Sequence, residues 1–324
     1  MRRCSSNCSN ADAAGTRPAA YSRNRLLRYV LIFIGSDCKY FMPQLCSQKQ
    51  NVRTRSWSRY ADVRKRLFRN LIDIHSHILW GVDDGARSLE QSLDMLMIAA
   101  NSGTTDIVAT PHANSEFSFD PQVIEERLAE LRAAVRDSIR IHNGCDFHLS
   151  YDNIQDALAK PAKYAINHRS YLLVEFSESI IPNTGGIFER LLHQGLTPII
   201  SHPERNEAIQ RKTEKLLDWV EQGCLLQITA QSLLGVFGKK AESYSNRLLS
   251  EGLVSFVASD AHDCTYRPPR INEAYAIVKN KMGLEEAKRI FIENPRRVLE
   301  GNPIDQNLRR YRQSERAPWY KFWS

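Results

Sequence analysis

The segment Leu71-Ile72-Asp73-Ile74-His75-Ser76-His77 is a short apolar run that ends in two histidines one residue apart. Side chains in a strand alternate between its two faces, so His75 and His77 point to the same side. Two imidazoles placed in this way can bind one metal ion. A single His-x-His pair is equally typical of a solvated strand, so the assignment depends on the rest of the chain.

A second candidate ligand motif, Ser259-Asp260-Ala261-His262, lies at the end of another apolar run far downstream. Its Asp-x-His pattern adds a carboxylate and a third imidazole. Mixed nitrogen and oxygen donors are the set that divalent transition metals favour. The two motifs together therefore indicate a metal site.

The composition is that of a soluble globular protein with one large domain or two ordinary ones. The chain has 324 residues, of which 42% are hydrophobic and 25% charged,. Its net charge of +7 is unevenly placed, because residues 1–68 contain 14 Lys and Arg against 3 Asp and Glu. The remainder is mildly acidic, which argues against a nucleic-acid surface there, whereas the basic extension could contact polyanions or anionic membrane.

These shifts in composition predict three parts. We expect residues 1–68 to be a disordered basic extension, or an upstream reading of the start codon with Met42 as a later start. Residues 69–303 would form one catalytic domain, and residues 304–324 a basic tail. The longest apolar run, at 29–35, is too short to span a membrane, and the scattered cysteines favour a reducing cytoplasm.

From Leu71 onward, β-branched runs alternate with segments of helical periodicity. Seven such alternations with fully apolar strands predict a parallel sheet, and in one domain of about 250 residues they favour a closed or nearly closed β/α barrel. A doubly wound open sheet is the alternative, although no glycine-rich nucleotide fingerprint follows any strand. The predicted strands are 71–75, 106–110, 139–144, 171–176, 197–201, 225–229 and 254–259, and the predicted helices lie near 88–102, 120–137, 184–195, 206–223, 239–252 and 271–292.

Potential metal ligands follow six of the seven predicted strands. Catalytic groups of β/α barrels gather at the carboxyl ends of the strands, where all of these residues fall. Any one of the histidines alone is more typical of a satisfied core residue, but so many coincidences at one face favour a metal site. The residues are His75 with His77, His112, Asp146, Glu175, His202, and Asp260 with His262.

Four other histidines do not fit this pattern. His142, His168 and His193 fall in the middle of a predicted strand, in a loop and late in a helix. We expect these three to be structural or solvated. His148 lies close to Asp146 and could support a ligand.

Five separated motifs resemble the polymerase-and-histidinol-phosphatase (PHP) superfamily, from about Leu71 to Leu299. Within it, the chain is similar to the bacterial manganese-dependent protein tyrosine phosphatases of capsular and exopolysaccharide systems. This closer resemblance rests on Asp83-Asp84-Gly85, the His-Pro-Glu-Arg run at 202–205 and Arg267-Pro268-Pro269. The superfamily motifs are the segments 73–86, 109–112, 201–206 and 259–262, with Glu175 at the end of another strand.

The resemblance implies a distorted (β/α)₇ TIM-like barrel of the PHP fold that holds up to three divalent ions. Mn²⁺ is the expected metal, with Fe or Zn as alternatives. Arg205 and Arg267 would clamp the phosphate while a metal-activated water hydrolyses the ester. Asp146 stands where relatives commonly carry Glu, which puts its bridging role in question. The implied metal ligands are His75, His77, Asp84, His112, Asp146, Glu175, His202, Asp260 and His262.

The implied substrate is a phosphotyrosine protein, expected to be the tail of a bacterial tyrosine kinase in capsule or exopolysaccharide synthesis. A homo-oligomer is possible, and neither a nucleic-acid partner nor a cysteine phospho-enzyme is expected. Two other functions remain open. One is a small-molecule phosphoesterase of the histidinol-phosphate type, and the other is a non-enzymatic polyanion-binding protein that acts through residues 1–68.

Overall fold

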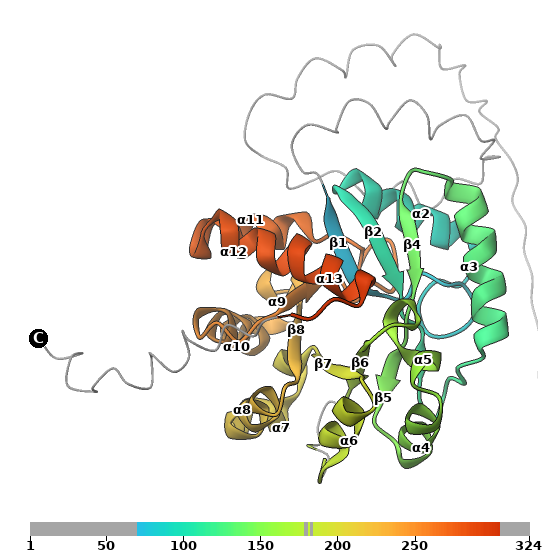
Figure 1. The fold of residues 1–324 in the computed structure, drawn as a ribbon. Helices are drawn as coiled ribbons and strands as arrows, with labels where there is room; N and C mark the ends of the chain where they lie inside the picture. Colours follow the sequence, from blue (N-terminus) through green and yellow to red (C-terminus); the bar gives the residue numbers. More distant parts are fainter. Residues whose placement is uncertain (1–69, 178–180, 182–183, 305–324) are drawn as a thin grey trace, which may run out of the picture. The chain divides into compact units, whose positions relative to one another are not determined.

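The computed structural model describes residues 70–304, apart from 178–180 and 182–183 (Figure 1). The predictions made for residues 1–68, and for all of the 304–324 tail but its first residue, lie outside these described residues. Within the described part, no helix is both long enough and apolar enough to cross a membrane.

The strands form two sheets in which the paired strands run parallel. This arrangement confirms the prediction of a parallel α/β fold. The first sheet has the order β1 (Leu71–Ser76), β2 (Thr104–Ala109) and β4 (Arg140–Asn143). The second has the order β3 (His112–Ala113), β5 (Asp146–His148), β6 (Tyr171–Glu175), β7 (Thr197–Ser201), β8 (Leu225–Thr229) and β9 (Phe256–Ala258).

Two of the predicted strands are each followed, after a short break, by a strand of the second sheet that was not predicted. Pro111 separates β2 from β3, because proline has no N–H to donate and restricts the residue before it. Gly144 and Cys145 separate β4 from β5. After both breaks, β3 pairs with β5, so that His112 lies directly opposite Asp146. On the other side, the segment after β9 returns to β1 through a parallel bridge between Ser76 and Ala261.

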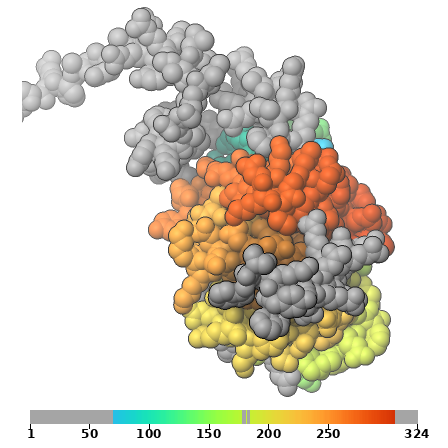
Figure 2. Space-filling view, turned by 90° about the vertical axis from the view of Figure 1, so that its left-hand side faces the viewer, coloured from blue at the N-terminus to red at the C-terminus, as the bar shows by residue number. Residues whose placement is uncertain are grey.

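Helices lie around the outside of the strands, as Figure 1 shows. Figure 2 shows the outer surface of the C-terminal helices in orange and red. The predicted helix 271–292 is interrupted at Gly283, whose φ of +93° favours glycine,. The helices near their predicted positions are α2 (Leu89–Asn101), α3 (Pro121–Val135), α6 (Ile187–His193), α7 (Glu207–Arg211), α8 (Thr213–Glu221), α10 (Gly238–Ser250), α11 (Asn272–Met282) and α12 (Leu284–Lys288) with the π-helix η3 (Arg289–Glu293). Those not predicted are α4 (Tyr151–Ala159), α5 (Pro161–Tyr164), α9 (Ala230–Leu233), α13 (Asn294–Glu300) and the 3₁₀ turns η1 (Ile166–His168) and η2 (Pro203–Arg205).

The strands are buried on both faces. All residues of β1 and β8 are buried, as expected for parallel strands that are covered by helices on one side and by other strands on the other,. Ile72, Val108, Leu173, Ile199 and Phe256 pack together in one apolar cluster. Because the strands bury apolar side chains along their length, the buried polar side chains at their carboxyl ends stand out as a separate layer.

Candidate metal centre

The nine residues predicted to bind metal all come together at the carboxyl ends of the strands. They fall into four overlapping groups, and within each group the potential ligand atoms lie within 4.8 Å of one another. The groups are His77 with Asp84, His112 and His262; His75 with His202 and Asp260; His75 with His77 and Asp146; and His112 with Asp146 and Glu175.

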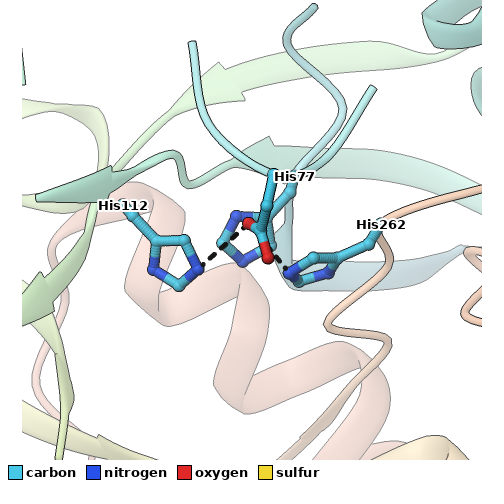
Figure 3. Close-up of side chains that lie close together, drawn as sticks. His77, His112 and His262 are labelled. Atoms are coloured by element: carbon cyan, nitrogen blue, oxygen red, sulfur yellow. Dashed lines mark ion pairs between the residues drawn. The ribbon is translucent and has the colours of Figure 1, made fainter. Parts of the chain in front are cut away.

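The first group lies nearest to solvent. In Figure 3, His77, His112 and His262 converge from three different segments of the chain. The Asp84 carboxylate lies 3.4 Å from His112 Nε2 and 3.5 Å from His262 Nε2. The side chain of Asp84 is 52% exposed, whereas those of the three histidines are at most 11% exposed. This group therefore borders solvent, as a catalytic metal site must if it is to admit substrate.

Asp84 reaches this group because the loop after β1 folds back on His77. A Cβ atom at Gly85 would lie 2.2 Å from the carbonyl oxygen of His77, so this position requires glycine. Ala86 N–H donates to that same carbonyl at 3.1 Å. The close approach of the Gly85 backbone thus explains why glycine follows the two aspartates.

Two groups share His75, whose ring can offer a single nitrogen to a metal. His75 Nδ1 is 2.9 Å from Gln227 Oε1, and this contact leaves Nε2 as the available donor atom. Nε2 lies 3.4 Å from both Asp146 Oδ2 and Asp260 Oδ1. An imidazole with one available nitrogen coordinates one ion, so His75 can serve only one of its two groups.

The last group contains two buried atoms that lie near opposite charges but form no hydrogen bond within the described residues. His112 Nδ1 lies 3.3 Å from both Asp146 Oδ2 and Glu175 Oε2. Yet His112 Nδ1 and Asp146 Oδ2 are buried and have no hydrogen-bond partner among the described residues. Buried polar atoms are rarely left in this state. The orphaned atoms and the mixed nitrogen and oxygen donors fit a bound divalent cation.

The histidines of the site differ in pKa because their buried positions face different charges. Burial by itself lowers the pKa of His75, but Asp146 and Asp260 outweigh it and raise this pKa to about 9. Burial and the neighbouring His77 lower the pKa of His262 to about 4, and burial with Arg205 holds the pKa of His202 well below its usual range. His202 and His262 are thus neutral donors at pH 7, whereas His75 must release a proton before it can coordinate a metal.

Two residues that orient the imidazoles were not among the predicted site residues. Asp83 Oδ2 lies 2.7 Å from His77 Nδ1. The same oxygen accepts a hydrogen bond from the backbone N–H of His112 at 3.2 Å. Gln227 holds His75 in the same way from within β8. The signal for Gln227 was present in the sequence, because it is a polar residue within the otherwise apolar run Leu225–Ile228.

We expect Asp83→Asn and Gln227→Leu each to weaken metal affinity by roughly 10- to 100-fold, the usual effect of removing an outer partner of a ligating histidine. Gln227→Leu removes the acceptor that fixes which ring nitrogen of His75 faces the ion, and Asp83→Asn removes the negative charge that holds the His77 ring in its orientation. Competition with a fluorescent chelator measures the affinity. Asp137→Asn, which removes an exposed carboxylate elsewhere, serves as the control, and unchanged affinity in both site variants would contradict the orienting role.

Asp260 connects the histidines to the two arginines. Its Oδ1 lies 3.4 Å from His75 Nε2 and from His77 Nε2. Its Oδ2 accepts hydrogen bonds from both Arg205 Nη1 and Arg267 Nη2. The two arginines predicted from the sequence therefore meet at one carboxylate beside the metal groups.

Two of the candidate ligands have unusual backbone conformations. The φ angles are +34° at His202 and +51° at Asp260, in the left-handed region that non-glycine residues rarely occupy,. The Asp260 N–H donates to the His75 carbonyl at 2.9 Å, which holds this conformation at the end of β1. Such strain is typical of functional sites, where the surrounding structure fixes the chain.

A cysteine phospho-enzyme was not expected because no cysteine was thought to have an arginine six positions later, and that reason is wrong. The chain does contain the Cys-x₅-Arg spacing of cysteine phosphatases, from Cys264 to Arg270. Those enzymes bind phosphate with the backbone N–H groups of such a loop. Here Pro268 and Pro269 have no N–H, and the N–H groups of Thr265, Tyr266 and Arg267 all donate to the Asp263 carboxylate,. Arg270 N–H donates to the Pro268 carbonyl at 2.8 Å, so every N–H group from Thr265 to Arg270 already has an acceptor within the loop. A cysteine mechanism is therefore unsupported.

The fold and the site define a class: a parallel α/β protein whose strand ends present imidazoles and carboxylates suited to several divalent ions. A family model described as "Capsular polysaccharide synthesis, CpsB/CapC" matches residues 71–300. The chain belongs to this family.

Related proteins with assigned names agree with this placement. The chain is 34% identical to the tyrosine-protein phosphatase YwqE of Bacillus subtilis, over 72% of this chain and 93% of that protein. It is 33% identical to the tyrosine-protein phosphatase CpsB of Streptococcus pneumoniae, over 71% of this chain and 98% of that protein. A crystal structure from work on YwqE and CpsB, described as metal-dependent tyrosine phosphatases, matches with a TM-score of 0.69 and 32% identity, over 74% of this chain and 98% of the matched chain.

Proposed function

We propose that this chain is a metal-dependent phosphotyrosine-protein phosphatase that acts in capsule or exopolysaccharide synthesis. The observation that carries the proposal is the meeting of clustered metal donors and two arginines at Asp260. The names of the related tyrosine-protein phosphatases support the same activity. Its substrate would be the phosphotyrosine-containing tail of a bacterial tyrosine kinase.

The nine clustered residues are proposed to hold up to three divalent ions, with Mn²⁺ foremost and Fe or Zn as alternatives. Bound ions would neutralise phosphoryl oxygens and lower the pKa of coordinated water. Asp146, whose side chain is shorter than the Glu expected there, fits a role as metal ligand, because its fully buried carboxylate lies within 3.4 Å of His75 Nε2 and 3.3 Å of His112 Nδ1.

Arg205 and Arg267 are proposed to bind and orient the phosphate. Guanidinium groups match phosphate oxygens through paired N–H donors. Arg267 Nε is buried and has no hydrogen-bond partner among the described residues, so this donor can serve a ligand. Burial raises the pKa of the Cys145 and Cys224 thiols, which makes both of these cysteines poor nucleophiles,.

We further propose that the two sheets form one distorted (β/α)₇ barrel within a catalytic domain at 69–303. The two chain segments that cross between the sheets and the Ser76–Ala261 bridge support closure. A cytoplasmic location and a homo-oligomeric state also belong to this proposal. The odd number of cysteines in the body supports the first of these,.

Metal removal and substrate choice test the proposed function together. The purified chain, freed of metal by a chelator, is expected to hydrolyse a phosphotyrosine peptide only after Mn²⁺ is returned. Phosphate release is measured with phosphotyrosine peptide, phosphoserine peptide and histidinol phosphate side by side. Preference for histidinol phosphate would favour the small-molecule phosphoesterase, and activity that persists in chelator would contradict metal dependence.

A further inference from the structure

Both arginines that meet at Asp260 also lie against one aromatic ring. The guanidinium carbon of Arg205 is 4.8 Å from the centroid of the Phe237 ring, and that of Arg267 is 5.8 Å away. The three residues come from separate parts of the chain, since Arg205 ends η2, Arg267 follows β9 and Phe237 immediately precedes α10. Phe237 is partly exposed, unlike the buried aromatic residues of the core.

We propose that Phe237 is a positioning residue that holds Arg205 and Arg267 in place for phosphate binding. This inference rests on the proposed function. Two guanidinium groups brought to one carboxylate repel each other, and Asp260 neutralises a single charge. The face of an aromatic ring attracts a cation without accepting its N–H groups. Phe237 can therefore restrain both arginines without occupying Arg267 Nε, which has no hydrogen-bond partner among the described residues.

The surrounding hydrogen bonds fix Phe237 relative to both arginines. The side chain of Gln231, in α9, donates to the Pro268 carbonyl at 2.8 Å and so ties α9 to the segment that carries Arg267. The buried Glu204 carboxylate accepts from Thr229 N–H at 2.8 Å and from the Ser232 hydroxyl at 2.7 Å. Glu204 thus ties the turn that carries Arg205 to the same helix.

The short connection from α9 to Phe237 is itself ordered by its backbone. Val236 N–H donates to the Gln231 carbonyl at 3.0 Å, and Gly238 N–H donates to the Gly235 carbonyl at 3.1 Å. Gly235 and Gly238 have φ angles of +76° and +87°. Phe237 therefore projects from a tight turn between two glycines, and its ring stays at a set place beside the arginines.

The test compares Phe237→Leu with Phe237→Tyr in the full chain loaded with Mn²⁺. Leucine keeps an apolar side chain but has no aromatic face, whereas tyrosine keeps the ring. We expect Phe237→Leu to weaken binding of inorganic phosphate, measured by calorimetry, by roughly tenfold and to raise KM for the phosphotyrosine peptide by a similar factor with little change in kcat. Phe237→Tyr should bind phosphate as the wild type does.

Controls separate this role from a general effect on folding. Val236→Ala changes an exposed neighbour on the same turn and should leave phosphate affinity unchanged. Metal content and thermal stability of each variant are measured in parallel. In an Arg267→Ala background, Phe237→Leu should have a smaller effect than in the wild type, because one of the two ring contacts is already lost.

The outcomes also separate this inference from the proposed function. Equal phosphate affinity in Phe237→Leu and the wild type would overturn the positioning role. An equal loss of phosphate affinity in Phe237→Leu and Phe237→Tyr would do the same. So would an undiminished effect of Phe237→Leu on phosphate affinity in the Arg267→Ala background. A wild-type chain that binds phosphate but does not hydrolyse phosphotyrosine would contradict the proposed function and still allow the Phe237 comparison.

Discussion

Replacing His75 and His77 together by alanine is expected to lower phosphatase activity by at least roughly a thousandfold, because catalysis by activated water depends on the bound ions. The two histidines contribute to three of the four donor groups, so the double variant removes a ligand from each of these three. The fourth group, formed by His112, Asp146 and Glu175, keeps its donors. Bound metal, measured by mass spectrometry, should fall with the activity.

A matched control distinguishes loss of ligands from loss of any histidine. His193 is exposed on α6, away from the strand ends, and His193→Ala should keep both activity and metal. Circular dichroism and thermal unfolding show whether the double variant is folded. A folded His75→Ala, His77→Ala variant that still hydrolyses phosphotyrosine would rule out the proposed metal mechanism.

Asp260→Asn is expected to lower kcat/KM by a similar factor, on the order of a thousandfold, although the side chain keeps its shape. Burial raises the pKa of Asp260, but His75, Arg205 and Arg267 outweigh it and hold this pKa well below its usual range. The native group is thus a carboxylate that faces imidazoles with one oxygen and both guanidinium groups with the other. Asparagine removes the negative charge that faces the imidazoles and the two guanidinium groups.

The control for Asp260 is a second buried aspartate in a comparable setting. Asp106 in β2 is bound by Arg140 through two hydrogen bonds and lies 3.0 Å from His142 Nε2. Asp106→Asn should destabilise the fold by about 1 kcal/mol, because it removes the buried negative charge that binds the exposed Arg140, without a specific loss of kcat/KM,. Equal kinetic losses in the two variants, measured where both are folded, would show that charge at Asp260 has no special role.

The strands could be predicted because of how they are buried. A parallel strand covered on both faces forms a continuous apolar run, and each of the seven predicted runs overlaps a strand, whereas β3 and β5 were not predicted,. The breaks at Pro111 and Gly144 were not predicted, because nothing in the local pattern shows that the chain changes sheet there. Short helices such as α5 and α9 were also missed, since four residues are too few for a helical periodicity.

The positions of the metal donors were equally predictable, since the carboxyl ends of parallel strands share one edge. The division of these candidate donors into four groups could not be predicted from the sequence. Asp83 and Gln227 choose which nitrogen of His77 and His75 faces the centre, and Gln227 lies 152 positions from His75 in the chain. Local sequence carries no signal for contacts of this range.

Eight of the nine candidate donors and their places after the strands can thus be predicted from the chain alone, because they follow from residue type and from the ends of the predicted strands, whereas Asp84 was implied only by the family resemblance. Which donors share an ion, and how Asp260 joins them to Arg205 and Arg267, depends on the tertiary structure. The physical reason is that each side chain has few atoms to offer. Asp260 has two carboxylate oxygens to share between imidazoles and arginines, and His75 has one available nitrogen to offer to one ion. Their partners depend on the packing of strands that are far apart in sequence.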